Sequence, residues 1–148
     1  MLDRNGIAAR IPHQGAMCLL DAVLEWSDAV IVCRAVSHVD PANPLRAEGR
    51  LGAAAGIEYA AQAMAVHGAL IAGAAAPPRQ GYLASVRSVT LHVARLDDIA
   101  GPLDVRAERL SGDGNHILYQ FRLDHAGRCL LEGRAAVVLD ASAQQGQP

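Results

Sequence analysis

The sequence predicts an α+β fold in which a curved antiparallel sheet wraps around one long central helix. The first observation is a run from Leu51 to Pro77 that is rich in alanine and carries one charged residue, Glu58. Such a run is expected to form a buried helix that ends before Pro77-Pro78, and a helix that is apolar on most sides must be covered broadly. The second observation is that strand-like segments precede and follow the run without further helices between them, which excludes a βαβ arrangement.

Two strand-like segments are predicted before the helix. Residues 1–17 look irregular, and residues 18–25 are ambiguous between a strand and a helical turn. Residues 29–36 are rich in β-branched side chains and have the length of a strand, with residues 27–28 as the turn of a hairpin. Residues 37–52 form a long loop, and loops of this length are often functional.

The chain after the helix is strand-like throughout. Residues 81–95 alternate in two phases, which one extra residue near Arg87-Ser88, a β-bulge, would reconcile. Residues 102–110, an alternating segment at 117–123 and a final segment at 129–139 are the other predicted strands, with tight turns between them.

Length and composition predict one domain without a nucleic-acid or membrane role. The chain has 148 residues, of which 51% are hydrophobic, so residues 1–140 are assigned to a single domain and residues 141–148 to a disordered tail. A net charge of −2 gives no footprint for nucleic acid. The start has no signal-peptide pattern, and Glu58, Gln62 and His67 make a membrane span costly. A cytoplasmic location is therefore predicted.

The cysteines predict neither disulfides nor a metal site. Cys18, Cys33 and Cys129 are odd in number, scattered, and without C-x-x-C spacing. Each lies within or beside an apolar strand-like run, so all three are assigned to the core as reduced thiols. Trp26 and Met64 are assigned to the core as well.

Glu58 is the first candidate for chemistry. Its helical neighbours are apolar, and Gln62 follows four residues later on the same predicted face. The alternative is a buried structural carboxylate that bonds to Gln62 or to backbone donors. Among the histidines, His67 is interpreted as a hydrogen-bonded core or interface residue, and a polar, solvated position is predicted for three others: His92, His116 and His125.

Several segments carry a resemblance to one known family. Residues 11–21, I-P-H-Q-G-A-M-C-L-L-D, are similar to an opening L-P-H-R-x-P-F-L-L-V-D. Residues 43–45 are similar to N-E-x-F-F, and the passage G-I-E-Y-A-A-Q-A at 56–63 is similar to P-G-V-x-x-x-E-A-x-A-Q. Residues 96–108 resemble P-G-D-x-L-x-x-x-V. These are motifs of the hotdog-fold 3-hydroxyacyl-acyl-carrier-protein dehydratases. The likeness spans residues 11–139 and is greatest to the short dehydratase-like proteins of aryl polyene biosynthesis clusters.

The resemblance implies a hotdog fold and a dehydratase that acts on acyl thioesters in fatty acid or polyene synthesis. The substrate would be held on the phosphopantetheine arm of an acyl-carrier protein, so the chain itself needs no cofactor. Glu58 falls on the family's helix carboxylate, and Gln62 on its glutamine. The family also implies a dimer, formed with a second copy or with a related dehydratase subunit, whose active tunnel lies at the interface.

The family's catalytic histidine is absent from its expected place. The segment before the helix reads E-G-R-L-G-A-A-A-G-I-E, and Arg50 stands where the histidine would be. An arginine that is always charged cannot act as a base. We therefore predict Glu58 as the catalytic acid and His13 as the provisional base. His38 is the second candidate, and the third possibility is that this chain supplies no base.

Further residues are predicted to bind the substrate. Backbone N–H groups near the helix start, at residues 52–56 and including Gly56, would stabilise the enolate of the thioester. Gln62 and Asn43 are also assigned to substrate binding, and Arg50 (or Arg46) to the phosphate of the carrier arm.

Two alternative functions stay open. The missing histidine favours a catalytically weak subunit that binds acyl chains or carrier protein and completes a heterodimer. An acyl thioesterase is the other alternative, because that chemistry also uses a carboxylate on a hotdog helix to activate water.

Overall fold

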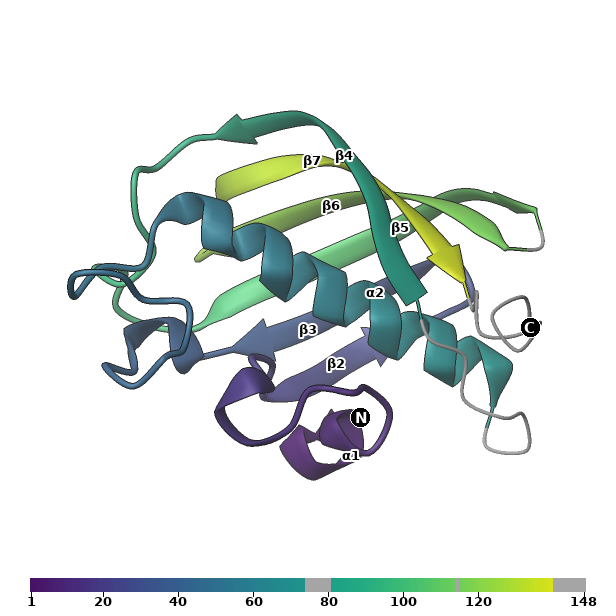
Figure 1. Cartoon of the computed structure of the whole chain (residues 1–148), viewed down its shortest axis with the longest axis horizontal. Helices are drawn as coiled ribbons and strands as arrows, with labels where there is room; N and C mark the ends of the chain where they lie inside the picture. Colours follow the sequence, from purple (N-terminus) through teal and green to yellow (C-terminus); the bar gives the residue numbers. More distant parts are fainter. Residues whose placement is uncertain (74–80, 114, 140–148) are drawn as a thin grey trace, which may run out of the picture.

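In the computed structural model, a seven-stranded antiparallel sheet curves around one long helix, α2 (Gly56–Ala72) (Figure 1). The structure describes residues 1–73, 81–113 and 115–139. The strands lie in the order β1-β2-β3-β5-β6-β7-β4. Their bounds are β1 (Leu2–Asp3), β2 (Ala22–Trp26), β3 (Val30–Ala35), β4 (Gly81–Leu91), β5 (Leu103–Asp113), β6 (His116–His125) and β7 (Arg128–Leu139). This is the predicted hotdog arrangement.

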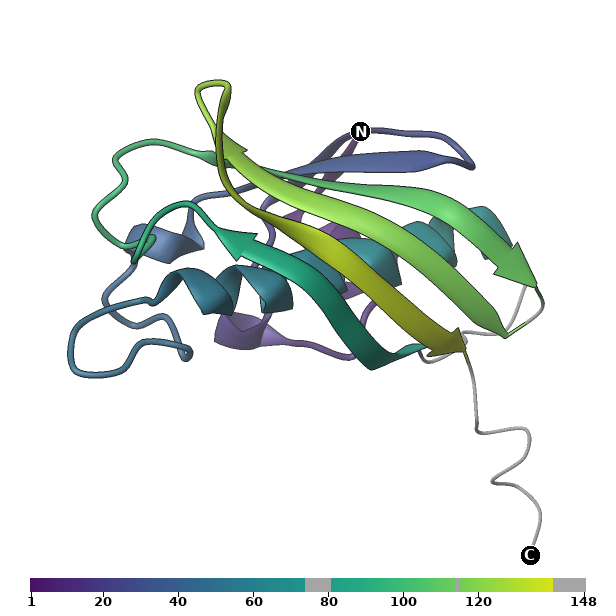
Figure 2. The same cartoon turned by 90° about the horizontal axis from the view of Figure 1, so that it is seen from above.

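The core lies between α2 and the concave face of the sheet. Figure 2 shows the long strands running diagonally across the helix. The predicted alternation in β6 is confirmed, because every second side chain is buried. Along the helix the buried side chains recur at helical spacing, and they include Tyr59, Ala60, Ala63 and Val66. Of the described helices, none is long and apolar enough to cross a membrane.

Glycines set where α2 approaches the sheet and where it ends. Gly56 is buried, and a Cβ built on it would lie 2.8 Å from a methyl carbon of Leu131 and 3.1 Å from one of Leu123. The missing side chain therefore lets the first turn of the helix lie directly on the sheet. At the other end Gly73 adopts a φ of 82°, which ends the helix at Ala72. The predicted stop at Pro77-Pro78 lies outside the described residues.

One predicted bulge and one predicted hairpin turn of the second half are confirmed. In β4 the register shifts between Arg87 and Thr90, and Ser88 takes a φ of 54°, so the predicted bulge is confirmed. The predicted hairpin turn between β6 and β7 is confirmed by the positive φ of Ala126 and Gly127, 50° and 81°.

Two expectations about the N-terminal part of the chain were wrong. Residues 1–17 are not irregular, because Asp3 caps the short helix α1 (Arg4–Ala8) by accepting a hydrogen bond from the Gly6 N–H. Trp26 is not in the core: it is 42% exposed at the end of β2, next to the hairpin turn. Met64 is buried as expected.

The three thiols are free but not equally buried. Cys18 and Cys33 are buried, and burial raises the pKa of Cys33 to about 12. Cys129 is only half-buried, which departs from the expectation of a core thiol. The tail at residues 141–148 lies outside the described residues.

His67 is a core histidine with both ring nitrogens bonded, as predicted. Its Nε2 lies 2.7 Å from the carbonyl oxygen of Ser27, and its Nδ1 lies 2.7 Å from the Tyr119 hydroxyl. A carbonyl can only accept, so Nε2 carries the proton and Tyr119 donates to Nδ1. Burial lowers the pKa of His67 and raises that of Tyr119 to about 12, so both groups are held neutral.

We expect Gly56→Ala to destabilise the protein by about 1–3 kcal/mol, because the new methyl group overpacks against Leu131 and Leu123. Gly68→Ala in the same helix is the matched control, because a Cβ there meets nothing within 4 Å. That control should stabilise by up to about 1 kcal/mol, since alanine favours the helix. Urea unfolding of both variants measures the difference; equal stabilisation would contradict the packing role.

We expect the free energy of unfolding to decrease as pH falls below 6.5, the ordinary pKa of histidine, because His67 binds a proton less readily in the fold than in the unfolded chain. Each extra proton bound on unfolding adds a slope of up to about 1.4 kcal/mol per pH unit. His67→Gln removes this titration while keeping one donor and one acceptor. Unfolding curves between neutral and acid pH should therefore converge for the two proteins, and parallel curves would exclude the effect.

Candidate active site

Glu58 lies in the first turn of α2, on the side of the helix that the sheet does not cover. Its side chain is exposed, and the residues that follow on this side, Ala61, Ala65 and Gly68, are only half-buried. Among the described residues none forms a hydrogen bond or an ion pair with the Glu58 carboxylate. The expected apolar tunnel around Glu58 is therefore not formed by this chain alone.

Gln62 is buried although it is only four residues from Glu58, and the two side chains are not bonded to each other. The Gln62 Oε1 accepts from the Leu19 N–H at 2.9 Å, and its Nε2 donates to the Met17 carbonyl at 2.7 Å. The proposed Glu58–Gln62 bond is therefore wrong. Gln62 holds residues 17–19 across the helix, and its assignment to substrate binding stays a prediction.

His13 lies in the loop between α1 and the short 3₁₀ turn η1 (Gly15–Met17). This loop continues into residues 17–19, which Gln62 holds against α2. The ring is half-buried, and its Nδ1 is buried without a hydrogen-bond partner among the described residues. His13 makes no ion pair with Glu58, so its role as a base stays a prediction.

His38, the second candidate base, is directed elsewhere. It is fully buried in the 3₁₀ turn η2 (Ser37–Val39), and its Nε2 donates to the Ile99 carbonyl at 3.0 Å. Burial lowers the pKa of His38, so the ring is neutral. A neutral ring bonded to the 99–101 loop, with no bond to Glu58, fits a structural role better than a catalytic one.

Asn43 holds the long loop against the helix. Its Nδ2 donates to the Tyr59 hydroxyl at 3.0 Å and to the Ser37 carbonyl at 2.9 Å, and its Oδ1 accepts from the Leu45 N–H. The Tyr59 hydroxyl donates in turn to Ser37 Oγ at 2.8 Å. The Ser37 hydroxyl then donates to the Leu19 carbonyl at 2.7 Å. Substrate binding by Asn43 stays a prediction.

Apart from Asn43, no residue of this network could be identified from the sequence, because its other members meet only in the fold. It ties the loop, the helix and the N-terminal segment together. Burial raises the pKa of Tyr59, which keeps the hydroxyl protonated at the centre of the network.

The two arginines of the long loop, Arg46 and Arg50, differ in whether the guanidinium group is already hydrogen-bonded. Arg46 donates to the carbonyls of Gly49 and His38, so it shapes the loop. Arg50 is exposed, and its side chain makes no hydrogen bond with the described residues. Of the two, Arg50 is free to meet an anionic group near the start of the helix.

Backbone donors also remain at the helix start. The N–H groups of Ala53, Ala55 and Gly56 already donate to carbonyls. Those of Gly52 and Ala54 meet no backbone carbonyl of the described residues. Gly56 therefore serves the packing described above. The backbone N–H groups that could still donate to the enolate oxygen of a thioester are those of Gly52 and Ala54.

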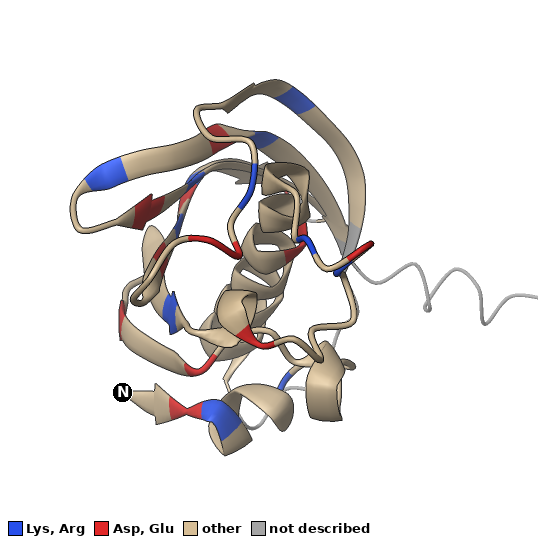
Figure 3. Ribbon diagram, turned by 90° about the vertical axis from the view of Figure 1, so that its left-hand side faces the viewer, with Lys and Arg blue, Asp and Glu red and all other residues tan. Residues whose placement is uncertain are grey.

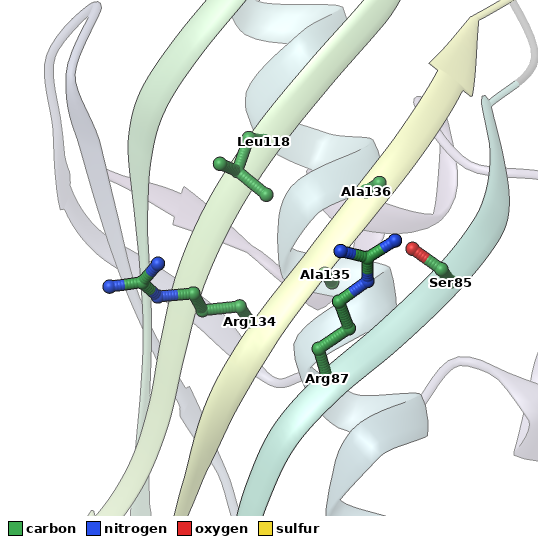
Figure 4. Close-up of a pocket in the computed structure, with 6 residues that line it drawn as sticks. All are labelled: Ser85, Arg87, Leu118, Arg134, Ala135 and Ala136. Atoms are coloured by element: carbon green, nitrogen blue, oxygen red, sulfur yellow. The ribbon is translucent and has the colours of Figure 1, made fainter.

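Most of the charged residues lie on the strands and loops around α2 rather than on the helix itself (Figure 3). A shallow groove of about 250 Å³ lies on the other side of the sheet, away from α2 (Figure 4). It is lined by Ser85, Arg87, Leu118, Arg134, Ala135 and Ala136. This groove contains none of the predicted site residues, so it is not the candidate active site.

The comparisons with known proteins agree with the fold. The chain is similar to the dehydratase heterocomplex ApeI:P from Xenorhabdus doucetiae, with 22% identity over 95% of both chains and a TM-score of 0.83. It is also similar to a thioesterase from Pseudomonas aeruginosa, with 14% identity over 95% of both chains and a TM-score of 0.67. A thioesterase from Haemophilus influenzae gives 11% identity, 94% and 91% coverage, and a TM-score of 0.66.

Comparison with the curated proteins gave no match. The family model described as ApeP dehydratase matches residues 5–146, which is nearly the whole chain. The chain therefore belongs to the ApeP-like family of dehydratases.

Proposed function

We propose that this chain is one subunit of an enzyme that dehydrates 3-hydroxyacyl groups on an acyl-carrier protein, and that a second, related dehydratase subunit completes its site. The observation that carries the proposal is the exposure of Glu58 on the uncovered side of α2. The carboxylate has no cover and no paired histidine among the described residues. A second subunit placed over this side of the helix would supply the cover.

The dehydration needs a base that removes the α-proton and an acid that protonates the departing hydroxyl. Glu58 is the proposed acid. A carboxyl group stays protonated near neutral pH when burial disfavours its charged form, so this role depends on the cover. The N–H groups of Gly52 and Ala54 are the proposed donors to the thioester oxygen, on which negative charge develops.

His13 remains the provisional base of this chain. His13 is favoured over His38 because its ring is only half-buried, whereas His38 is fully buried and its Nε2 is bonded to the Ile99 carbonyl. The Nδ1 atoms of both rings are buried without a partner among the described residues. A buried polar atom without a hydrogen bond is costly, which favours its use by a substrate or a second subunit.

The substrate would reach the site on its carrier. Arg50 is the proposed contact for the phosphate of the phosphopantetheine arm, because it is exposed and unbonded near the start of α2. The arm belongs to the acyl-carrier protein, so the chain needs no cofactor of its own. The proposed substrates are acyl chains of fatty acid or aryl polyene synthesis. The proposed location is the cytoplasm.

β4 is the proposed edge for subunit pairing. It is an 11-residue strand at one end of the sheet, paired only with β7 among the described strands, whereas β1 at the other end has two residues. Leu83 and Leu91 on this strand are 39% and 47% exposed. A long edge strand with exposed apolar side chains favours pairing with another chain. The likeness to the ApeI:P heterocomplex supports a heterodimer over a homodimer.

The test is mass spectrometry of a 3-hydroxyacyl-carrier protein incubated with this chain, alone and with a dehydratase subunit encoded beside it. The proposal expects the loss of one water from the acyl group when both subunits are present. Release of the free acid would instead make the protein a thioesterase. An unchanged substrate with both subunits would refute a catalytic role and leave acyl or carrier binding.

In this assay we expect Glu58→Gln to lower turnover by about 10²–10⁴-fold, the usual effect of losing a general acid. The fold should be unaffected, because the Glu58 side chain is exposed and makes no hydrogen bond with the described residues. Glu25→Gln is the matched control, since Glu25 is also an exposed carboxylate but lies in β2. Wild-type turnover in Glu58→Gln would remove the site assignment.

His13→Ala in the same assay separates two sources of the base. A loss comparable to that of Glu58→Gln would assign the base to this chain. Full turnover in His13→Ala, with Glu58→Gln inactive, would place the base on the second subunit.

A further inference from the structure

A second group of reactive side chains, which does not include Glu58, lies where the end of β4 meets the start of β7. His92 Nε2 donates to Glu132 Oε2 at 2.8 Å, and the Cys129 thiol lies 3.7 Å from the same oxygen. One potential ligand atom from each residue lies within 4.8 Å of the others. An imidazole, a thiol and a carboxylate therefore converge on one point.

A β-bulge brings Cys129 and Glu132 to the same face. In a regular strand, residues three apart point to opposite faces of the sheet. In β7, however, Leu131 pairs with Leu123 while Cys129 pairs with the next residue, Asp124, so Leu130 is an extra residue. Leu130 and Leu131 are both buried, and the side chains on either side of them emerge together.

The bulge at Leu130 also positions His92. The bulge at Ser88 shifts the register of β4 before His92 is reached. The His92 N–H then donates to the carbonyl of Leu130, the bulged residue of β7, at 2.8 Å. Two irregularities on neighbouring strands thus combine to place the three side chains together. Bulges commonly re-aim side chains in this way.

We propose that His92, Cys129 and Glu132 bind a Zn²⁺ ion, with water in the fourth position. Nitrogen, sulfur and oxygen donors of these three residue types are the usual zinc ligands. Zinc bonds of about 2.0–2.3 Å in a tetrahedron separate the ligand atoms by roughly 3.3–3.8 Å. The side chains of His92 and Glu132 are each 40% exposed, which leaves them room to reach those separations.

The neighbouring charges permit this site. Arg122 lies opposite Glu132 in the ladder, but its guanidinium is bonded to Asp124 at 2.9 Å. Binding releases one proton from the Cys129 thiol to solvent, because the ligand is the thiolate. The proton that His92 Nε2 donates to Glu132 moves to Nδ1, so that the neutral ring binds through Nε2. The bound ion would tie the end of the edge strand β4 to the start of β7.

The test is titration of the untagged full chain with Co²⁺, a spectroscopic substitute for Zn²⁺. We expect one equivalent to bind with a sulfur-to-cobalt charge-transfer absorption, and Zn²⁺ to displace it. Cys129→Ser should abolish the absorption, and His92→Ala should weaken binding by roughly tenfold or more. His116→Ala is the matched control, since His116 is an exposed histidine on β6 outside the cluster, and it should bind as the parent does.

Three results would overturn the proposal. The first is the absence of saturable binding by the folded parent chain. The second is a charge-transfer absorption that survives in Cys129→Ser, which would assign the sulfur to another cysteine. The third is equal weakening by His92→Ala and His116→Ala. Circular dichroism establishes that each variant is folded, and Glu132→Gln, which preserves side-chain shape, should weaken binding as His92→Ala does.

Discussion

The structure depends on the burial of α2 on one side only. The strands enclose the face of the helix that carries Tyr59 and Val66, and Gly56 lets its first turn lie on the sheet. The opposite side, with Glu58, is left open by the same packing. A single curved sheet cannot enclose a helix completely, so an apolar helix of this kind has surface left for a second chain. The position of the helix therefore determines both the core and the candidate site.

The sequence was sufficient to predict the main helix and several strands of the fold. The alanine-rich run predicted the helix, the alternation in residues 117–123 predicted β6, and the phase change near Ser88 predicted a bulge. These signals are local, because periodicity depends on which face of a single element is buried. Trp26 was misplaced for the same reason. Trp26 pairs with Ile31 in the sheet, but it lies at the end of β2 and is 42% exposed, and only the fold determines what packs over the end of a strand.

The site was harder to predict because a motif residue can serve the fold as well as the chemistry. Gln62 and Asn43 match the motifs of the dehydratases, yet their side-chain atoms bond to the chain itself. Each side chain supplies hydrogen bonds to backbone groups of a loop that would otherwise have no partner. A buried backbone group without a partner is costly. Glu58 differs from both, since it stands at a motif position and contributes no bond to the described structure. The functional role of this carboxylate stays a prediction.

The cluster of His92, Cys129 and Glu132 illustrates what a linear pattern omits. Metal motifs are recognised by short spacings on one segment, and the cysteines here have none. The three residues meet because one bulge in each of two strands cancels the normal alternation, so their convergence depends on the register of the whole sheet. Register is set by burial of the apolar side chains on the other face, including Leu130 and Leu131. The same apolar packing that encloses α2 therefore also determines which polar side chains meet on the outside of the sheet.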